Sequence, residues 1–172
     1  MSLELKMNSP IIVIIHGPMA SGKSTITNKL EKLLVNYHFI DRAYIKNIML
    51  KKLENRELAK NLSKNATFLI MSGLMQSKEN IMLQEMRSPQ IKKHFTKEIK
   101  RHGYKIKSFY LECSLKTAQK RDLKRQKRYI RPEVVAEMHK KHAYPDKEDI
   151  IINTETCPIK EIINKIMKEL QR

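Results

Sequence analysis

The stretch that decides the fold is Gly17-Pro18-Met19-Ala20-Ser21-Gly22-Lys23-Ser24-Thr25, which fits the pattern G-x-x-x-x-G-K-[ST] at every fixed position. The β-branched run Ile11-Ile12-Val13-Ile14-Ile15 comes just before it and predicts a strand buried on both faces. Apolar residues at helical spacing follow the motif, namely Ile26, Leu30, Leu33 and Leu34. The motif therefore lies between a strand and a helix.

This context is the one that a phosphate-binding loop (P-loop) requires. Glycines let the backbone curve so that successive N–H groups point at phosphate oxygens, over the positive end of the helix that follows. Lys23 would then reach the β- and γ-phosphates of ATP, and Ser24 would hold Mg²⁺. We therefore predict residues 17–25 as the nucleotide-binding segment. The alternative is an ordinary glycine turn between a strand and a helix.

The length of 172 residues suits one α/β domain with a core of its own. We expect residues 1–10 to form a disordered lead and residues 11–172 a single domain, with a lid at about 115–145. Cys113 and Cys157 lack the spacing of a disulfide framework or a zinc site, which favours a reducing compartment. The apolar run at 11–15 is too short for a membrane span, so we expect a cytoplasmic protein with no membrane partner.

The chain carries a formal net charge of +17. A strongly basic surface attracts nucleic acid or anionic substrates and speeds their association. Lysine is spread along the whole chain beside abundant isoleucine, however, so a biased or thermophilic proteome is the alternative explanation.

The apolar periodicity predicts strands that alternate with helices along the whole chain. The expected strands are 11–15, 37–41, 80–86, 105–112 and 150–153, and the expected helices are 24–36, 44–53, 56–77, 88–101, 115–129, 133–142 and 159–170. This alternation predicts an α/β protein with a parallel sheet and helices on both of its faces.

The helix expected at 56–77 has an apolar stripe, which normally faces the core. The stripe contains Leu58, Leu62, Ala66, Leu69, Ile70 and Leu74, and it is widened by Phe68, Met71 and Met75. Lys60, Lys64 and Asn65 lie on the opposite face. Methionines at this spacing are interpreted as core filler rather than as a functional feature.

The basic segment 116–131 suggests a lid for phosphoryl transfer. Arg121, Arg125 and Arg128 are spaced at i, i+4 and i+7, so one helical face would present three guanidinium groups, which suit phosphate oxygens. We expect Arg121 and Arg125 to close over the triphosphate or the acceptor, with Arg128 on the substrate side. The alternative is a solvated basic face, because lysines accompany the arginines in this segment.

Transfer of a phosphoryl group to a hydroxyl usually needs a carboxylate near the acceptor. Ligands of open α/β sheets bind at the carboxyl ends of the strands, where Asp41 and Glu85 are expected. Asp41 is the candidate base, and Glu85 would contact Mg²⁺ through water or contact the substrate. The alternative for each is a strand-end acid that caps a helix or pairs with a lysine. Further candidates for binding an anionic acceptor are Arg42, Lys46 and Arg87.

These motifs together resemble the P-loop kinases that include polynucleotide kinases, zeta-toxin-like kinases and small-molecule kinases of adenylate-kinase-like fold. The resemblance rests on residues 17–25, on the acid that ends Ile81–Glu85, on Ala118-x-x-Arg121-x-x-x-Arg125 and on Ile151-Ile152-Asn153-Thr154. It implies a three-layer P-loop NTPase fold with a five-stranded parallel sheet in the order 2-3-1-4-5 and a small helical lid. It also implies that Asn153 and Thr154 lie near the adenine.

The chain departs from polynucleotide kinases at the general base. Their Arg-Asp-x-x-Arg motif aligns without gaps with Arg42-Ala43-Tyr44-Ile45-Lys46, so alanine stands at the position of the base. Either Asp41 replaces it, or the acceptor is not the 5′-hydroxyl of a nucleic acid, or the protein binds a nucleotide without transferring phosphate.

The leading hypothesis is an ATP- and Mg²⁺-dependent kinase that acts on a hydroxyl or phosphate acceptor in a nucleic acid, a nucleotide or a small molecule. The alternatives are a regulatory P-loop protein that binds a nucleotide without turnover, and a nucleic-acid-binding protein with a vestigial P-loop. The sequence has no Asn-Lys-x-Asp guanine signature. The acceptor, the oligomeric state and the choice between ATP and GTP stay open.

Overall fold

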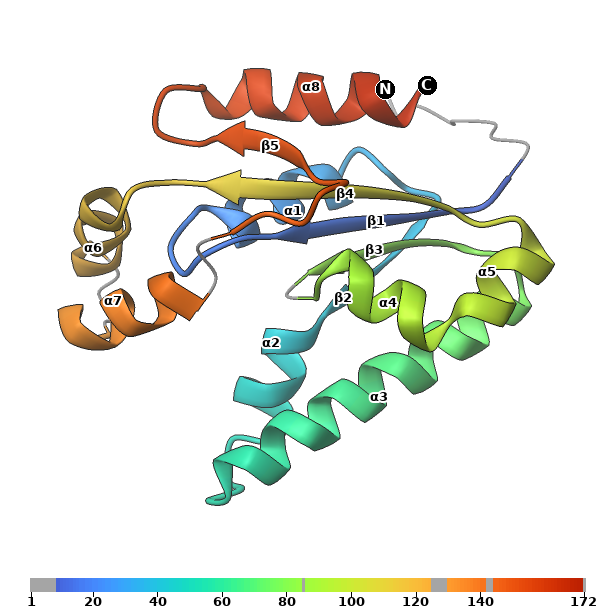
Figure 1. Cartoon of the computed structure of the whole chain (residues 1–172), viewed down its shortest axis with the longest axis horizontal. Helices are drawn as coiled ribbons and strands as arrows, with labels where there is room; N and C mark the ends of the chain where they lie inside the picture. The colour runs from blue at the N-terminus through green and yellow to red at the C-terminus, as the bar shows by residue number, and fades with distance from the viewer. Residues whose placement is uncertain (1–8, 85, 125–129, 142–143, 172) are drawn as a thin grey trace.

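The computed structural model describes residues 9–171, apart from residues 85, 125–129 and 142–143 and the side chain of Met49. Its centre is a parallel sheet in the order β2-β3-β1-β4-β5 (Figure 1). The strands are β1 (Ile11–His16), β2 (Tyr37–Asp41), β3 (Asn80–Gln84), β4 (Lys105–Glu112) and β5 (Ile150–Asn153). The expected strand order is confirmed. No helix within the described ranges is both long enough and apolar enough to cross a bilayer.

Strand β1 occupies the middle of the sheet because it pairs on both of its edges. Ile14 lies beside Leu83 of β3 on one side and beside Ser108 of β4 on the other. All five residues at 11–15 are fully buried. A strand that is covered on both faces needs an uninterrupted apolar sequence, and this run provides one.

Helices cover both faces of the sheet and form the outer two of three layers (Figure 1). On one face, Ile11, Val13 and Ile15 of β1 belong to a core with helices α1 (Lys23–Glu31) and α8 (Ile159–Leu170). On the other face, Ile12 and Ile14 share a second core with residues of three further helices. These are α3 (Arg56–Gln76), α4 (Ser88–His94) and α5 (Thr96–His102).

The remaining helices lie at the carboxyl ends of the strands (Figure 1). Helix α2 (Arg42–Tyr44) continues directly into a short π-helix, η1 (Ile45–Met49). Helices α6 (Leu115–Leu123) and α7 (Pro132–Lys141) lie between β4 and β5 in the sequence. The functional residues are expected at this edge of the sheet.

Four expected helices differ from the observed ones. Helix α1 ends at Glu31 instead of residue 36, and the helix expected at 44–53 is the single turn α2 followed by η1.

The helix expected at 88–101 is divided at Phe95, whose buried ring packs edge to face against Phe68. Helix α6 ends at Leu123, and buried Asp122 accepts a hydrogen bond from the backbone N–H of Ile130. The predicted lead falls mostly on residues 1–8, outside the described residues.

Helix α3 has the expected bounds to within one residue, but the prediction that its apolar stripe faces the core is wrong for four members of the stripe. Ala66 and Leu74 pack against the core as expected. Phe68, Met71 and Met75 do pack in the core, together with Ala59, Ser63 and Thr67. Leu58, Leu62, Leu69 and Ile70 are instead exposed. Burial of Ser63 and Thr67 costs little because each hydroxyl donates to a carbonyl in the preceding turn, at 2.9 Å and 2.8 Å.

We expect Gly17→Ala to destabilise the fold by about 3 kcal/mol, since it combines steric overlap with backbone strain. Gly17 has φ +136°, and a Cβ there would lie 2.4 Å from the carbonyl oxygen of Leu111 in β4. Urea unfolding measures the loss. Gly73→Ala is the matched control, because its Cβ meets no atom within 4 Å and alanine favours the helix by about 1 kcal/mol. Equal stabilities for the two variants would contradict the packing argument.

Candidate functional site

The P-loop follows β1 directly and turns the chain into α1. Three of its residues, Gly17, Ala20 and Gly22, have positive φ angles of +136°, +59° and +96°. The first helical hydrogen bond runs from the N–H of Ile26 to the carbonyl oxygen of Gly22, at 3.1 Å. The loop therefore ends at the amino end of a helix, where N–H groups and the helix dipole favour an anion.

The side chain of Lys23 is held inside this loop. Its Nζ donates to the carbonyl oxygens of Gly17, at 3.0 Å, and Pro18, at 2.8 Å, and the residue is only 7% exposed. The ammonium group thus lies where the loop curves and lines the cleft in front of it. This position places a fixed positive charge beside the site predicted for phosphate.

A short chain of hydrogen bonds links the P-loop helix to β3. Buried Gln84, the last residue of β3, donates from Nε2 to Oγ of Ser24 at 3.4 Å and accepts from Oγ1 of Thr27 at 2.7 Å. The exposed Ser24 hydroxyl is thereby oriented at the start of α1, as a Mg²⁺ ligand requires. Gln84 was not among the predicted site residues, although a polar side chain at the end of the apolar run 81–83 was a visible signal. Glu85, which was identified, falls outside the described residues.

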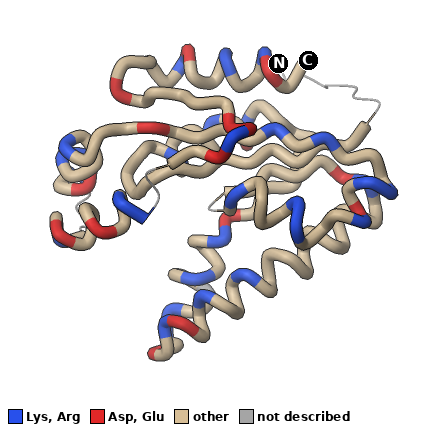
Figure 2. Tube along the Cα trace, viewed as in Figure 1, with Lys and Arg blue, Asp and Glu red and all other residues tan. Residues whose placement is uncertain are grey.

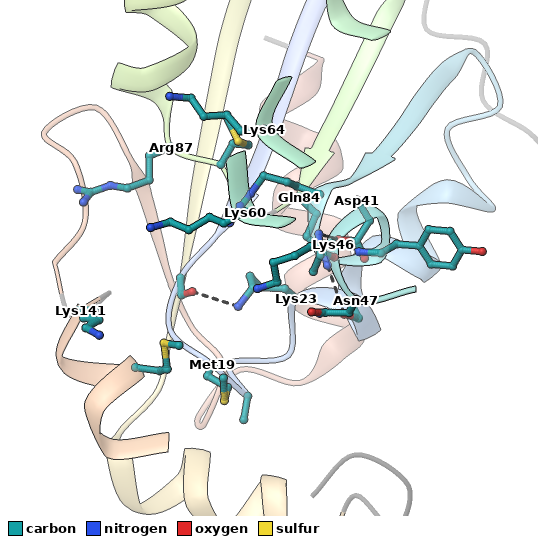
Figure 3. A pocket seen from close by; sticks show the side chains of 18 of the residues that line it. Met19, Lys23, Asp41, Lys46, Asn47, Lys60, Lys64, Gln84, Arg87 and Lys141 are labelled. Carbon is teal, nitrogen blue, oxygen red and sulfur yellow. Dashed lines mark hydrogen bonds between the residues drawn. The ribbon is translucent and has the colours of Figure 1, made fainter. Parts of the chain in front are cut away.

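A cleft of about 820 Å³ opens in front of the P-loop (Figure 3). Seven of its described lining residues are cationic: Lys23, Arg42, Lys46, Lys60, Lys64, Arg87 and Lys141. Asp41 is the one acidic side chain among the lining residues that the structure describes. The cleft is therefore suited to a ligand with several negative charges.

The cations of the cleft come from five separate parts of the chain, two of which contribute Lys23 and Arg87. Arg42 and Lys46 were predicted and lie on α2 and η1, whereas Lys60 and Lys64 on α3 and Lys141 on α7 were not. The i, i+4 spacing of Lys60 and Lys64 shows that they lie on one face of the helix. It does not show which part of the protein that face approaches. Figure 3 shows their side chains in the same cleft as Lys23.

Asp41 lies at the end of β2 and lines the cleft. Its Oδ1 accepts hydrogen bonds from the backbone N–H groups of Ala43, at 2.8 Å, and Tyr44, at 3.3 Å. The carboxylate is thus the N-cap of α2, the structural role that the sequence left as an alternative. Both of these hydrogen bonds are accepted by Oδ1. Asp41 can therefore cap the helix and still line the cleft.

Arg121 was expected over the triphosphate or the acceptor, and in this structure its side chain is hydrogen-bonded to the P-loop and to the segment after β5. Its guanidinium donates to the carbonyl oxygen of Ala20 at 3.4 Å, and to the hydroxyl and carbonyl oxygens of Thr154 at 2.9 Å and 2.6 Å. It is not among the described residues that line the cleft. Arg121 therefore joins α6 to the P-loop and to the segment after β5. Arg125 and Arg128 lie outside the described residues.

The segment after β5 has an ordered turn of its own. Oδ1 of Asn153 accepts from the N–H groups of Glu155, at 2.9 Å, and Thr156, at 3.3 Å. The hydroxyl of Thr154 donates to the carbonyl oxygen of Glu112 at 3.0 Å. These bonds fix Thr154 beside Arg121, on the α6 side of the P-loop.

Arg87, predicted to bind an anionic acceptor, is paired with a carboxylate of the protein. Its Nε donates to Oδ2 of Asp146 at 3.0 Å, and its Nη2 contacts Oδ1 of the same carboxylate. The hydrogen bond that Arg87 donates to Asp146 is the main reason that the pKa of Arg87 is raised. Asp146 therefore fixes the direction of Arg87 at the wall of the cleft.

A buried histidine–aspartate pair anchors the same segment to the start of the P-loop. Nε2 of His16, the residue before Gly17, lies 2.9 Å from Oδ2 of Asp149, and the Asp149 side chain is fully buried. Ligand atoms of His16, Asp146 and Asp149 lie within 4.8 Å of one another. Within this cluster, the carboxylate of Asp146 is already paired with Arg87.

The family model described as AAA domain matches residues 13–145, more than half of the chain. No curated protein sequence matches the chain. Among solved structures, a candidate kinase from Chloroflexus aurantiacus J-10-fl has a TM-score of 0.74 at 16% identity, with coverage of 96% of this chain and 98% of that one. Deoxyadenosine kinase from M. mycoides with bound dATP has a TM-score of 0.62 at 18% identity (94% and 99% coverage).

A gluconokinase from Sinorhizobium meliloti 1021 has a TM-score of 0.60 at 12% identity and covers 94% of this chain and 91% of its own. These identities are low, so the likenesses establish the fold. The fold is that of the P-loop kinases, as the resemblance in the sequence predicted.

We expect the Asp149→Asn variant to lose less of its free energy of unfolding than the wild type loses when the pH falls from 7 to 2. Burial alone raises the pKa of Asp149, but hydrogen bonds from His16, Ser108 and the N–H of Asp146 outweigh it and lower the pKa below 3.8. A lowered native pKa gives stability that is present above about pH 4 and is lost as pH falls through the native value. Urea midpoints at pH 2–7 test this. Urea midpoints that fall equally with pH in the wild type and the variant would contradict this role of Asp149.

Proposed function

The chain belongs to the AAA domain family, and from that premise we propose that it is a kinase that uses ATP and Mg²⁺ and phosphorylates an anionic acceptor. One observation carries the proposal: the P-loop lysine, Lys23, and the carboxylate of Asp41 line the same cationic cleft. An oxygen of the acceptor attacks the γ-phosphorus, the bond to the β,γ-bridging oxygen breaks, and ADP leaves.

The nucleotide side of the cleft supports ATP as the donor. The curved loop at residues 17–22 and the start of α1 offer backbone N–H groups, Lys23 offers an ammonium, and Ser24 offers a hydroxyl. Mg²⁺ would neutralise charge on the β- and γ-phosphates when bound, and Ser24 is the described residue that would hold it. Arg121 would keep Asn153 and Thr154 in place near the base of the nucleotide.

The opposite side of the cleft supports an acceptor that carries negative charge. Arg42, Lys46, Lys60, Lys64 and Lys141 contribute five positive charges from the lining, in addition to Lys23 and the paired Arg87. Lys60 and Lys141 also pair with Glu57 and Glu137 of their own helices, which are not among the described lining residues of the cleft. A nucleic acid, a nucleotide or a phosphorylated small molecule would each supply the complementary charge.

Asp41 is proposed as the group that orients a hydroxyl acceptor and accepts its proton. It is the carboxylate of the described cleft lining, and the polynucleotide kinase base position is occupied by Ala43. The backbone N–H groups of the helix cap hold one oxygen of Asp41 in place. Orientation by a fixed carboxylate is the contribution that phosphoryl transfer to a hydroxyl requires.

A regulatory protein that binds a nucleotide without turnover is the second candidate. The specific observation in its favour is that Asp41 already serves as a helix cap while Ala43 offers no acid. The two candidates differ in a single measurable property, the release of ADP in the presence of an acceptor.

We expect Lys23→Ala to abolish ATP-induced stabilisation and to lower kcat/KM by about 10³-fold, because it removes the positive charge beside the γ-phosphate. Thermal midpoints with and without ATP–Mg²⁺ test binding, since a ligand at 100 times its Kd stabilises by about 2.7 kcal/mol. ADP release with 5′-hydroxyl oligonucleotides, nucleoside monophosphates and sugar phosphates tests turnover. Exposed Lys29→Ala on α1 is the control. Undiminished turnover in Lys23→Ala would refute the proposal.

We expect Asp41→Asn to lower kcat by about 10²- to 10⁴-fold while stability stays nearly unchanged, because asparagine caps a helix as well as aspartate does but accepts no proton. Asp41→Ala is the companion variant, which should lose about 1 kcal/mol of stability as well as activity. Steady-state kinetics and urea unfolding separate the two effects. If Asp41→Asn turns over at the wild-type rate, Asp41 is only a cap.

A further inference from the structure

The outward face of α3 carries a row of large apolar side chains. Leu58, Leu62, Leu69 and Ile70 are 44%, 41%, 76% and 46% exposed, and we call them the leucine face. A helix that packs on a sheet normally turns such residues inward and presents polar residues to solvent. Clusters of exposed apolar side chains on a protein surface mark interaction sites.

Neither the core nor the cleft uses the leucine face. The core receives the opposite side of α3 through Phe68, Met71 and Met75, and the cleft receives Lys60 and Lys64. At 3.6 residues per turn, Leu58, Leu69, Leu62 and Gly73 fall within an arc of about 60°. This arc lies across the helix from the buried side, so the leucines form one surface that another molecule could cover.

The spacing of this surface makes it complementary to itself. If two α3 helices pack antiparallel about a two-fold axis between residues 65 and 66, Leu62 of each meets Leu69 of the other. Leu58 of each then meets Gly73 of the other, and a Cβ on Gly73 has no atom within 4 Å, so a leucine side chain has room there. Large residues thus lie opposite large residues or an open position, as an isologous interface requires.

The charges of α3 favour the same arrangement. Its four charged residues, Arg56, Glu57, Lys60 and Lys64, are all in the first half, whereas residues 67–76 carry no charged side chain. Figure 2 shows this second half of α3 without Lys, Arg, Asp or Glu. Antiparallel packing sets the charged half of one helix against the uncharged half of the other. Parallel packing would instead set the two charged halves, each with a net charge of +2, along the same stretch of the helix pair.

We propose that the leucine face is the interface of a homodimer in which the two α3 helices pack antiparallel about a two-fold axis. Lys60 and Lys64 lie on the other side of each helix, so both clefts face away from the interface. The inference does not depend on kinase activity, because dimerisation is measured without nucleotide or acceptor.

Sedimentation equilibrium of the full chain tests the proposal. We expect a dimer for the wild type at micromolar concentration, and at least a 100-fold higher dissociation constant for the double variant Leu62→Asp/Leu69→Asp, since it buries two charges in the interface. Val35→Asp is the matched control, because Val35 is 56% exposed in the turn between α1 and β2. A monomeric wild type at 100 µM, or a dimer that the double variant leaves intact, would overturn the proposal.

A second pair of variants guards against loss of folding. Gly73→Phe should weaken the dimer at least 10-fold because the ring fills the space for Leu58 of the other copy, while Gly73→Ala should keep it. Circular dichroism should show a folded chain for both, since position 73 is open in one copy. A dimer unaffected by Gly73→Phe would refute the antiparallel register.

Cross-linking at the axis tests the register directly. In a Cys157→Ser background, Asn65→Cys should join two copies through a short bismaleimide, because residue 65 lies beside the two-fold axis. Lys100→Cys, on α5, should give no cross-linked dimer. Equal cross-linking at both positions would indicate random collision and would contradict the proposed interface.

Discussion

The architecture depends on the complete burial of β1. This strand hydrogen-bonds to β3 and β4 on its two edges and is covered by a helical layer on each face, so its end has a single position. Gly17 follows at that end and passes so close to Leu111 that only glycine fits. The curve of the P-loop is therefore set by the packing of the sheet, and a ligand does not have to impose it.

Hydrogen bonds connect the two sides of the site through the segment before β5. His16, at the base of the P-loop, pairs with Asp149, and Arg87, at the wall of the cleft, pairs with Asp146 three residues earlier. Gln84 makes a second connection between β3 and Ser24. The residues that would bind the donor and those that would bind the acceptor thus share supports, which limits their relative movement.

The sequence predicted the features that local interactions determine. The P-loop, the five strands and the bounds of α3 follow from short patterns of glycine, β-branched and apolar residues. The side of α3 that faces the sheet could not be predicted from such patterns, because the sequence of this helix has two overlapping periodicities. Leucines lie at 58, 62 and 69, and small or flexible residues lie at 59, 63, 67, 71 and 75. The second set of residues packs toward the sheet, and its buried hydroxyls form hydrogen bonds within the helix. The positions of Lys60 and Lys64 in the cleft depend on the same rotation of α3.

The cationic cleft also has a consequence for the protein without its ligands. Seven positive side chains line that space with the single carboxylate of its described lining, and carboxylates outside the lining, such as Glu57, Asp146 and Glu137, offset part of their charge. The positive charge that remains favours anions in the cleft. Small anions of the surrounding solution would occupy the cleft and compete with larger anions for the same positions. For the proposed anionic acceptor, selectivity would then come from counter-ion exchange: a polyanion displaces several small anions at once, with a gain in their translational entropy.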